Sequence, residues 1–127
     1  MLELAKKNKV DVVCSNIEHL PFKEASFDLI YSLATFCYVE NLDSVLNEAF
    51  RTLKPGKKII WFYMDPEHSY TKKYQRWDHL PTFFFDVAVI LKKAEDAGFS
   101  ENIVYKESCI VAYSMTKPSK VLETQEL

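Results

Sequence analysis

Glycine is scarce in this chain, with only Gly56 and Gly98 among 127 residues. Each follows an apolar helical pattern, a place where a left-handed residue commonly ends a helix, so both are expected at helix ends. Loops that let the backbone approach a nucleotide closely need several glycines at short spacing, because other residues disfavour positive φ. The sequence therefore predicts that this chain builds no glycine-rich nucleotide-binding turn.

Paired cysteines and long apolar runs are missing as well. Cys14, Cys37 and Cys109 are odd in number and far apart, which predicts reduced thiols rather than a disulfide, zinc or redox motif. No stretch approaches the roughly 20 apolar residues of a membrane span, and the first residues form no apolar leader. We therefore expect a cytoplasmic protein that does not interact with a membrane.

Charge of one sign is not concentrated anywhere. The net charge is -2 and the lysines are scattered among acidic residues, so the basic stripe of a nucleic-acid-binding protein is absent and no such partner is expected. His68 and His79 lie in a segment without a clean period, which predicts no metal site. With 48% hydrophobic and 27% charged residues, the composition is that of one globular domain over residues 1–127.

The most regular pattern in the chain predicts a helix. Asn41 is a favourable N-cap, and the apolar residues after it fall at i, i+3, i+4, i+7, i+8 and i+11, as on one face of a helix that ends at Pro55-Gly56. A second helix is predicted between Asp86, as its cap, and Gly98. Helical propensity in residues 1–8 suggests the end of another helix.

Short apolar or β-branched runs predict the strands, which we expect at residues 10–14, 27–33, 58–64, 103–105 and 109–113. The run at 27–33 is mostly apolar, as in a parallel strand covered on both faces. A strand, a helix and a strand of these lengths form a right-handed parallel crossover, so the fold class is α/β. Residues 65–85 predict a loop or lid with a broken helix, and 117–127 a frayed polar tail.

Four motifs carry a resemblance to a known family: Asn16 to Phe22 (NIEHLPF), Ser26 to Ile30 (SFDLI), Glu48 to Gly56 (EAFRTLKPG) and Ala97 to Phe99 (AGF). Their order and spacing resemble the C-terminal half of the class I S-adenosylmethionine-dependent methyltransferases of the type 11 group, over about residues 1 to 105. The resemblance implies a partial Rossmann-like fold with a mostly parallel sheet that lacks its first two strands. It also implies S-adenosylmethionine as cofactor and a small-molecule methyl acceptor.

The same resemblance implies site residues. Asn16, where the family has an acid, and Ile17 would hold the adenine ring of the cofactor. The segment Ser32, Leu33 and Ala34 would lie along its methionine end, and Tyr38 would contact the substrate. Glu48 and Arg51 are most simply a surface ion pair. The aromatic residues between Tyr70 and Phe85 are as typical of a packed lid as of an acceptor pocket.

Two functions remain open at this level. One is a methyltransferase in truncated form, with weak or no cofactor binding by this chain alone, because the family's glycine-rich turn would fall before Met1. The alternative is a non-catalytic or complementing half that serves as a binding module for a partner chain. Without its neighbours, the strand at 27–33 would present an unpaired edge, which predicts a homo-oligomer or a complementing chain.

Overall fold

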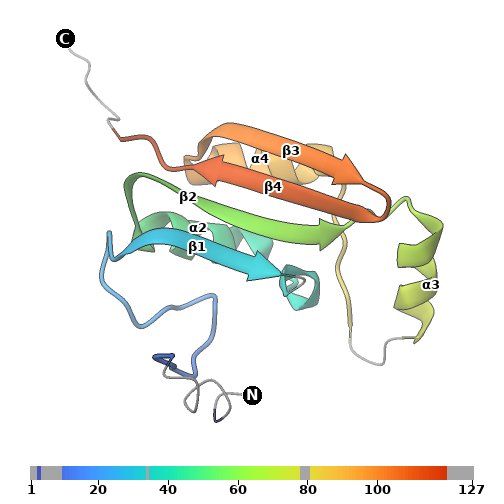
Figure 1. The fold of residues 1–127 in the computed structure, drawn as a ribbon, viewed down its shortest axis with the longest axis horizontal. Coiled ribbons are helices and arrows are strands. Elements are labelled where there is room, and N and C mark those ends of the chain that lie inside the picture. The colour runs from blue at the N-terminus through green and yellow to red at the C-terminus, as the bar shows by residue number, and fades with distance from the viewer. Residues whose placement is uncertain (1–2, 4–9, 34, 78–80, 120–127) are drawn as a thin grey trace.

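A four-stranded sheet with two helices on one face forms the centre of the molecule. The structure, a computed structural model, describes residue 3 and residues 10–33, 35–77 and 81–119. In Figure 1 the sheet lies in front, α2 and α4 pack behind it, and α3 stands at the end where β2 finishes. In chain order the elements are β1 (Phe27–Leu33), the 3-10 helix η1 (Phe36–Tyr38), α2 (Leu42–Thr52), β2 (Leu53–Met64), α3 (Ser69–Trp77), α4 (Val87–Ala97), β3 (Ser100–Glu107) and β4 (Ile110–Thr116).

The sheet is mixed, with the strand order β1-β2-β4-β3. β1 and β2 pair in parallel, with Tyr31 opposite Ile60 and Leu33 opposite Phe62. β4 returns antiparallel to β2, and β3 pairs antiparallel with β4. The α/β class and the parallel crossover are thus confirmed. The expectation of a mostly parallel sheet is corrected, because the last two strands form a hairpin that adds two antiparallel pairings.

The strand predicted at residues 10–14 does not form, since residues 10–16 have no regular secondary structure. Val10 and Val13 are 55% and 53% exposed. β-branched residues favour a strand chiefly through packing against cross-strand neighbours. No backbone hydrogen bond that we find within the described residues joins this segment to another strand, so its composition alone is insufficient.

The helix predicted after Asn41 is present as α2. The side-chain oxygen of Asn41 accepts a hydrogen bond from the backbone N–H of Ser44 at 3.2 Å, which caps the first turn. Its apolar stripe is buried against the sheet: Leu42, Val45, Leu46 and Ala49. The helix ends at Thr52, before Pro55-Gly56, and β2 therefore begins at Leu53 rather than at Lys58.

Gly98 ends α4 as predicted, with φ at 107°. A Cβ at this position would lie 2.9 Å from two ring carbons of Phe50 on α2, so glycine is required both for the left-handed backbone and for the close approach of the two helices. The predicted cap Asp86 precedes α4, although its side chain makes no capping hydrogen bond.

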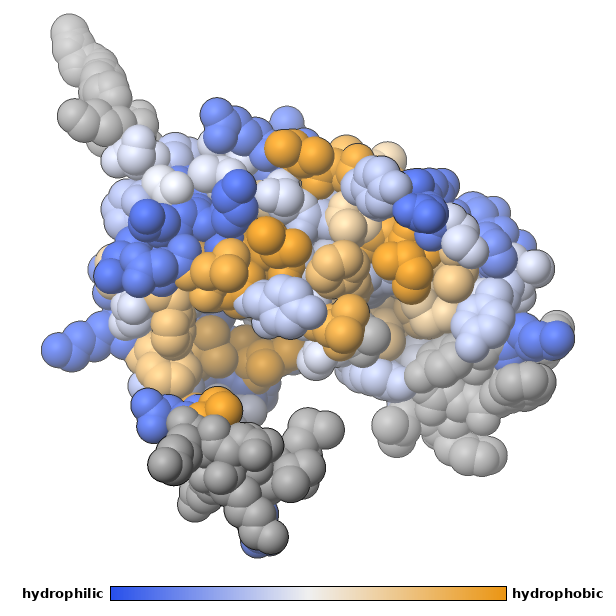
Figure 2. Space-filling view, viewed as in Figure 1, coloured by the Kyte–Doolittle hydropathy of each residue, from blue (hydrophilic) through white to orange (hydrophobic). Residues whose placement is uncertain are grey.

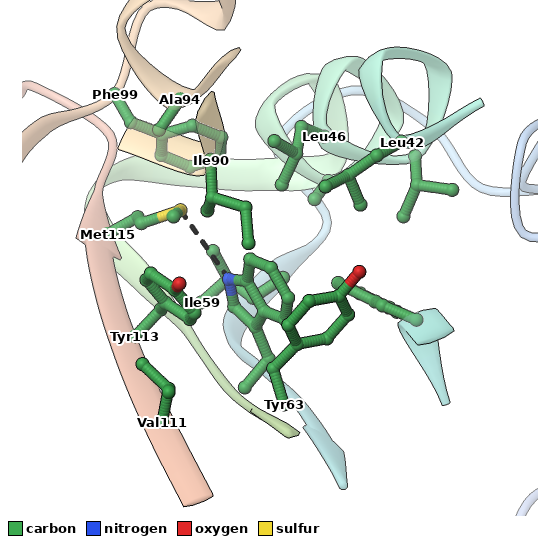
Figure 3. Close-up of a cluster of buried hydrophobic side chains, with 14 of the residues drawn as sticks. Leu42, Leu46, Ile59, Tyr63, Ile90, Ala94, Phe99, Val111, Tyr113 and Met115 are labelled. Carbon is green, nitrogen blue, oxygen red and sulfur yellow. Dashed lines mark hydrogen bonds between the residues drawn. The ribbon is translucent and has the colours of Figure 1, made fainter. Parts of the chain in front are cut away.

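The core lies between the sheet and the two helices, and Trp61 of β2 is its largest fully buried side chain. The Trp61 ring stacks on Tyr113 at 4.6 Å between centroids and contacts Phe36 at 4.8 Å. Its Nε1–H donates to the sulfur of Met115 at 3.5 Å, the dashed line in Figure 3. Side chains from α2, α4, β2 and β4 gather in the same cluster, so this core joins both helices to the sheet.

The opposite face of the sheet is open. On β1, Leu29, Tyr31 and Leu33 are 53%, 62% and 61% exposed, so the expectation that this strand is covered on both faces is wrong for the described chain. The helices cover only the side on which Ile59, Trp61 and Tyr63 lie. Figure 2, in the same view, shows hydrophobic side chains gathered over the strands on this open face.

Candidate functional site

A cavity of about 190 Å³ lies at the outer strand β1, near the carboxyl end of that strand. Its wall is almost entirely apolar, and Tyr31, Ser32 and Thr35 are the lining residues that carry a hydroxyl. Open α/β sheets bind ligands beyond the carboxyl ends of their strands, where loops converge. The cavity is lined by Ile17, Leu20, Ile30, Tyr31, Ser32, Thr35, Phe36, Val45, Ala49 and Ile59.

Two of the residues predicted to bind the cofactor, Ile17 and Ser32, meet in this cavity. They come from the loop before β1 and from β1 itself. Asn16 is exposed and does not line it. Instead, its Oδ1 accepts from the backbone N–H of Glu18 at 2.9 Å and its carbonyl accepts from that of His19 at 2.9 Å. Asn16 thus shapes the turn from which Ile17 projects.

Two other predicted site residues, Leu33 and Tyr38, lie outside this cavity. Leu33 points to the open face of the sheet, where it is 61% exposed. Ala34 lies outside the described residues. Tyr38, in η1, lines a separate and more open hollow with Glu40, Pro81 and Phe83. Their roles in binding cofactor or substrate stay predictions.

Sequence reasoning missed most of the cavity wall. The helical period correctly puts Val45 and Ala49 on the buried face of α2. The helical periodicity cannot tell which buried residues contact another side chain and which line a cavity. This depends on the elements that pack against the helix. Thr35 and Phe36 come shortly after the end of β1 at Leu33. Because ligands bind beyond the carboxyl ends of parallel strands, this position could have indicated that they line the cavity.

Glu48 and Arg51 of α2 hold the loop that carries Ile17. Arg51 Nε lies 2.7 Å from Glu48 Oε2, and its Nη2 lies 2.9 Å from Glu48 Oε1. The backbone N–H of Leu20 donates to Glu48 Oε1 at 2.7 Å, and Arg51 Nη2 donates to the Leu20 carbonyl at 3.1 Å. The expected surface ion pair is therefore a clamp on both backbone polar groups of Leu20, which lines the cavity.

The clamp changes the acidity of Glu48. The hydrogen bond from Arg51 lowers the pKa of Glu48 from its ordinary value of 4.5 to about 2, with burial opposing the shift and the Leu20 N–H assisting it. The same hydrogen bond raises the pKa of Arg51. Both groups therefore stay charged through the neutral and mildly acidic range, and the loop stays attached to α2.

We expect Glu48→Gln to remove a pH-dependent part of the stability. Because the folded pKa, about 2, lies below the ordinary value of 4.5, ionised Glu48 stabilises the fold fully above pH 4.5, and this contribution is lost as the pH falls through about 2. The free energy of unfolding of the wild type should exceed that of the variant above pH 5, and the difference should shrink towards pH 2. Urea unfolding at several pH values measures it.

The matched control is Glu95→Gln, on the exposed side of α4. Its free energy of unfolding at pH 6 should differ little from that of the wild type, as for most exposed substitutions. If the free energies of unfolding of the wild type and of Glu48→Gln differ by the same amount from pH 6 to pH 2, this result contradicts the clamp.

The segment between α3 and α4 is tied to the carboxyl ends of β1 and β2. The N–H of Phe83 donates to the Cys37 carbonyl at 2.7 Å. The Tyr63 hydroxyl donates to the Phe83 carbonyl and accepts from the N–H of Phe85 at 3.0 Å. Burial of this hydroxyl raises the pKa of Tyr63 to about 12, so it remains a neutral donor. The predicted broken helix in 65–85 is α3, and the role of this segment as a lid stays a prediction.

The glycines of this chain do not reach the cavity. Gly98 packs beneath Phe50, and a Cβ on Gly56 would meet Ser119 at 3.4 Å. No glycine therefore lines this cavity, and it offers no glycine turn to a ribose or to an amino-acid chain. Over the described ranges, no group of three or more His, Cys, Asp or Glu is arranged to hold a metal ion. No described helix is long and apolar enough to cross a membrane.

Comparison with known proteins identifies the family to which this geometry belongs. The family model described as "Methyltransferase domain" matches residues 1–61. The structure of an S-adenosylmethionine-dependent methyltransferase from Thermotoga maritima is 27% identical, with a TM-score of 0.82 over 92% of this chain and 69% of its own. A 24-methylenesterol C-methyltransferase of Arabidopsis thaliana is 34% identical over 95 residues. The chain is thus similar to class I methyltransferases in sequence and in fold.

The chain spans only part of the length of the methyltransferases that it matches. The alignment with the plant enzyme covers 65% of this chain and 26% of the plant enzyme. A ubiquinone/menaquinone biosynthesis C-methyltransferase of Bartonella henselae is 43% identical over 51 residues, or 40% of this chain and 20% of that protein. The chain thus spans about a quarter or less of these two relatives. The predicted family and the partial Rossmann-like fold are confirmed, and S-adenosylmethionine is the cofactor of this family.

Proposed function

We propose that this chain contributes the adenine end of an S-adenosylmethionine site in a methyltransferase that acts on a small organic acceptor. The observation that carries the proposal is the meeting of Ile17 and Ser32 in one apolar cavity near the carboxyl end of β1. A purine is flat and largely apolar on its faces, so such a slot suits it, while hydroxyls at the rim can hydrogen-bond its edge.

The chemistry would come from the cofactor, whose sulfonium supplies an activated methyl group. The protein then mainly positions donor and acceptor. In this chain, Ile17 and Phe36 would contact the base, Ser32 and Thr35 would offer hydroxyls, and the Glu48–Arg51 clamp would fix the loop. Because no glycine lines the cavity, we propose that the chain alone holds the base weakly and does not hold the rest of the cofactor.

A partner polypeptide would supply the remaining contacts in this proposal. The alternative function, a binding module without catalysis, is favoured by the same lack of a glycine turn. Transfer of a labelled methyl group by an assembled complex would separate the two. We place the reaction in the cytoplasm, in keeping with the three free cysteines Cys14, Cys37 and Cys109.

Titration with cofactor fragments, followed by amide chemical shifts in solution, tests the proposal. Adenosine and S-adenosylhomocysteine should bind with similar, roughly millimolar dissociation constants, because only the base and its surroundings are held, and free methionine should produce no shifts. The perturbed amides should be those of the cavity, Ile17, Ser32 and Thr35 above all. S-adenosylhomocysteine bound at micromolar affinity, or shifts centred on other residues, would contradict this assignment.

A further inference from the structure

A second hollow, of about 370 Å³, lies beside η1 and is lined by Tyr38, Glu40, Pro81 and Phe83. Small-molecule sites usually measure about 300–1,000 Å³, so the hollow is large enough for a small organic molecule. Two of its lining residues are aromatic, and Glu40 is the only charged residue among the described lining residues. Aromatic rings and a carboxylate both attract positive charge. The chemistry of the wall therefore favours a cation with an apolar body.

The aromatic wall at Phe83 is fixed on both sides of its peptide unit. The N–H of Phe83 donates to the carbonyl of Cys37 in η1 at 2.7 Å. The carbonyl of Phe83 accepts from the hydroxyl of Tyr63, at the end of β2. The segment before α4 is thus attached to the same 3-10 helix that carries Tyr38. Because the two aromatic residues are held in place before a ligand arrives, binding pays little for ordering them.

The 3-10 helix η1 contributes a wall to both the hollow and the cavity at β1. Phe36 lines the cavity, and Tyr38, two residues later, lines the hollow. A 3-10 helix rises about 2 Å per residue, so these two residues stand close together along its axis. Figure 1 shows η1 at the tip of the β1 arrow, the carboxyl end of that strand. A molecule in the hollow therefore lies next to the place proposed for the cofactor.

We propose that the methyl acceptor is an organic cation, held in this hollow by the rings of Tyr38 and Phe83 and by the carboxylate of Glu40. The inference rests on the proposed function, because an acceptor exists only if methyl transfer does. A quaternary or protonated nitrogen has no free lone pair. The charged nitrogen therefore binds the acceptor in the hollow, and a different atom of the acceptor receives the methyl group.

Tetramethylammonium and tert-butanol, a neutral molecule of similar size, test the preference for charge. Followed by amide chemical shifts, tetramethylammonium should perturb Tyr38, Glu40 and Phe83, and tert-butanol should bind at least about tenfold more weakly, because a neutral molecule gains neither the ring nor the carboxylate attraction. Glu40→Gln should raise the dissociation constant of tetramethylammonium about fivefold, the loss of one carboxylate near solvent. Glu67→Gln, an exposed glutamate that does not line the hollow, should leave it unchanged.

Two substitutions of Tyr38 separate the ring from the rest of the side chain. Tyr38→Phe keeps the aromatic face and should bind tetramethylammonium as the wild type does. Tyr38→Leu keeps an apolar side chain without the ring and should raise the dissociation constant at least about threefold. Circular dichroism spectra that match the wild type establish that both variants are folded.

Adenosine and tetramethylammonium report on different amides, so the two proposals can fail separately. Both ligands should bind together, and saturating adenosine should leave the affinity for tetramethylammonium no weaker. Equal binding of tert-butanol, an affinity indifferent to both Glu40→Gln and Tyr38→Leu, or competition with adenosine would each overturn the cationic acceptor, while the adenosine shifts of Ile17 and Ser32 remain. Binding of tetramethylammonium without any binding of adenosine would refute the proposed function, and the role of the cation as acceptor with it.

Discussion

The Trp61→Ala variant is expected to lose about 3–5 kcal/mol of unfolding free energy, the range for removing a fully buried large aromatic side chain. Trp61 has no exposed surface and contacts the rings of Phe36, Tyr63 and Tyr113. Its removal leaves a cavity where α2, α4 and the sheet meet. A loss of this size approaches the whole stability of many small domains, so the variant should be largely unfolded or close to it.

Urea unfolding followed by far-ultraviolet circular dichroism measures this effect, at one fixed protein concentration because any dimer would add to the apparent stability. The control is Tyr70→Ala, since Tyr70 is 54% exposed on α3 and such surface changes usually stay within about 0.5 kcal/mol. A Trp61→Ala loss below about 1 kcal/mol would mean that the core is centred elsewhere.

The elements that the sequence predicted well are those whose determinants are local. α2 begins at Leu42, directly after its cap Asn41, because the capping side chain and the apolar stripe both lie within the helix. Gly98 ends α4 for the same kind of reason, since its backbone conformation is a property of one residue. β1 also lies where its apolar run predicted.

The failures concern features that depend on distant neighbours. Residues 10–14 carry a strand composition, but no strand of the described chain lies beside them. The run at 27–33 has the composition of a strand covered on both faces, yet among the described residues helices cover only one of its faces. The Glu48–Arg51 pair has the spacing of an ordinary surface ion pair, and its clamp on Leu20 depends on a loop 28 and 31 residues earlier in the chain. Such contacts are set by tertiary structure, which periodicity cannot report.

The candidate site was only partly predictable for the same reason. Ile17 and Ser32 were inferred through the family resemblance, and both line the cavity. Asn16, Leu33 and Tyr38 came from the same reasoning and lie outside it. Adjacent residues of a strand point to opposite faces, and Leu33 is 61% exposed on the open face while Ser32 lines the cavity.

The Ala49→Phe variant is expected to abolish adenosine binding while leaving the fold as stable as before or more stable. Ala49 is 4% exposed on α2 and its methyl group lines the cavity of about 190 Å³. An engineered cavity of about 150 Å³ accommodates benzene, so the phenyl ring can occupy the space proposed for the base. Filling a cavity commonly adds about 0.5–2 kcal/mol of stability.

Opposite changes in binding and stability distinguish this effect from general damage to the fold. The amide shifts of Ile17 and Ser32 on titration with adenosine should disappear in Ala49→Phe, whereas urea unfolding should show no loss of stability. Ala88→Phe, on the exposed side of α4, should keep both the shifts and the stability of the wild type. If Ala49→Phe bound adenosine as the wild type does, the base would lie outside this cavity, and the assignment of Ile17 and Ser32 to the cofactor would fail with it.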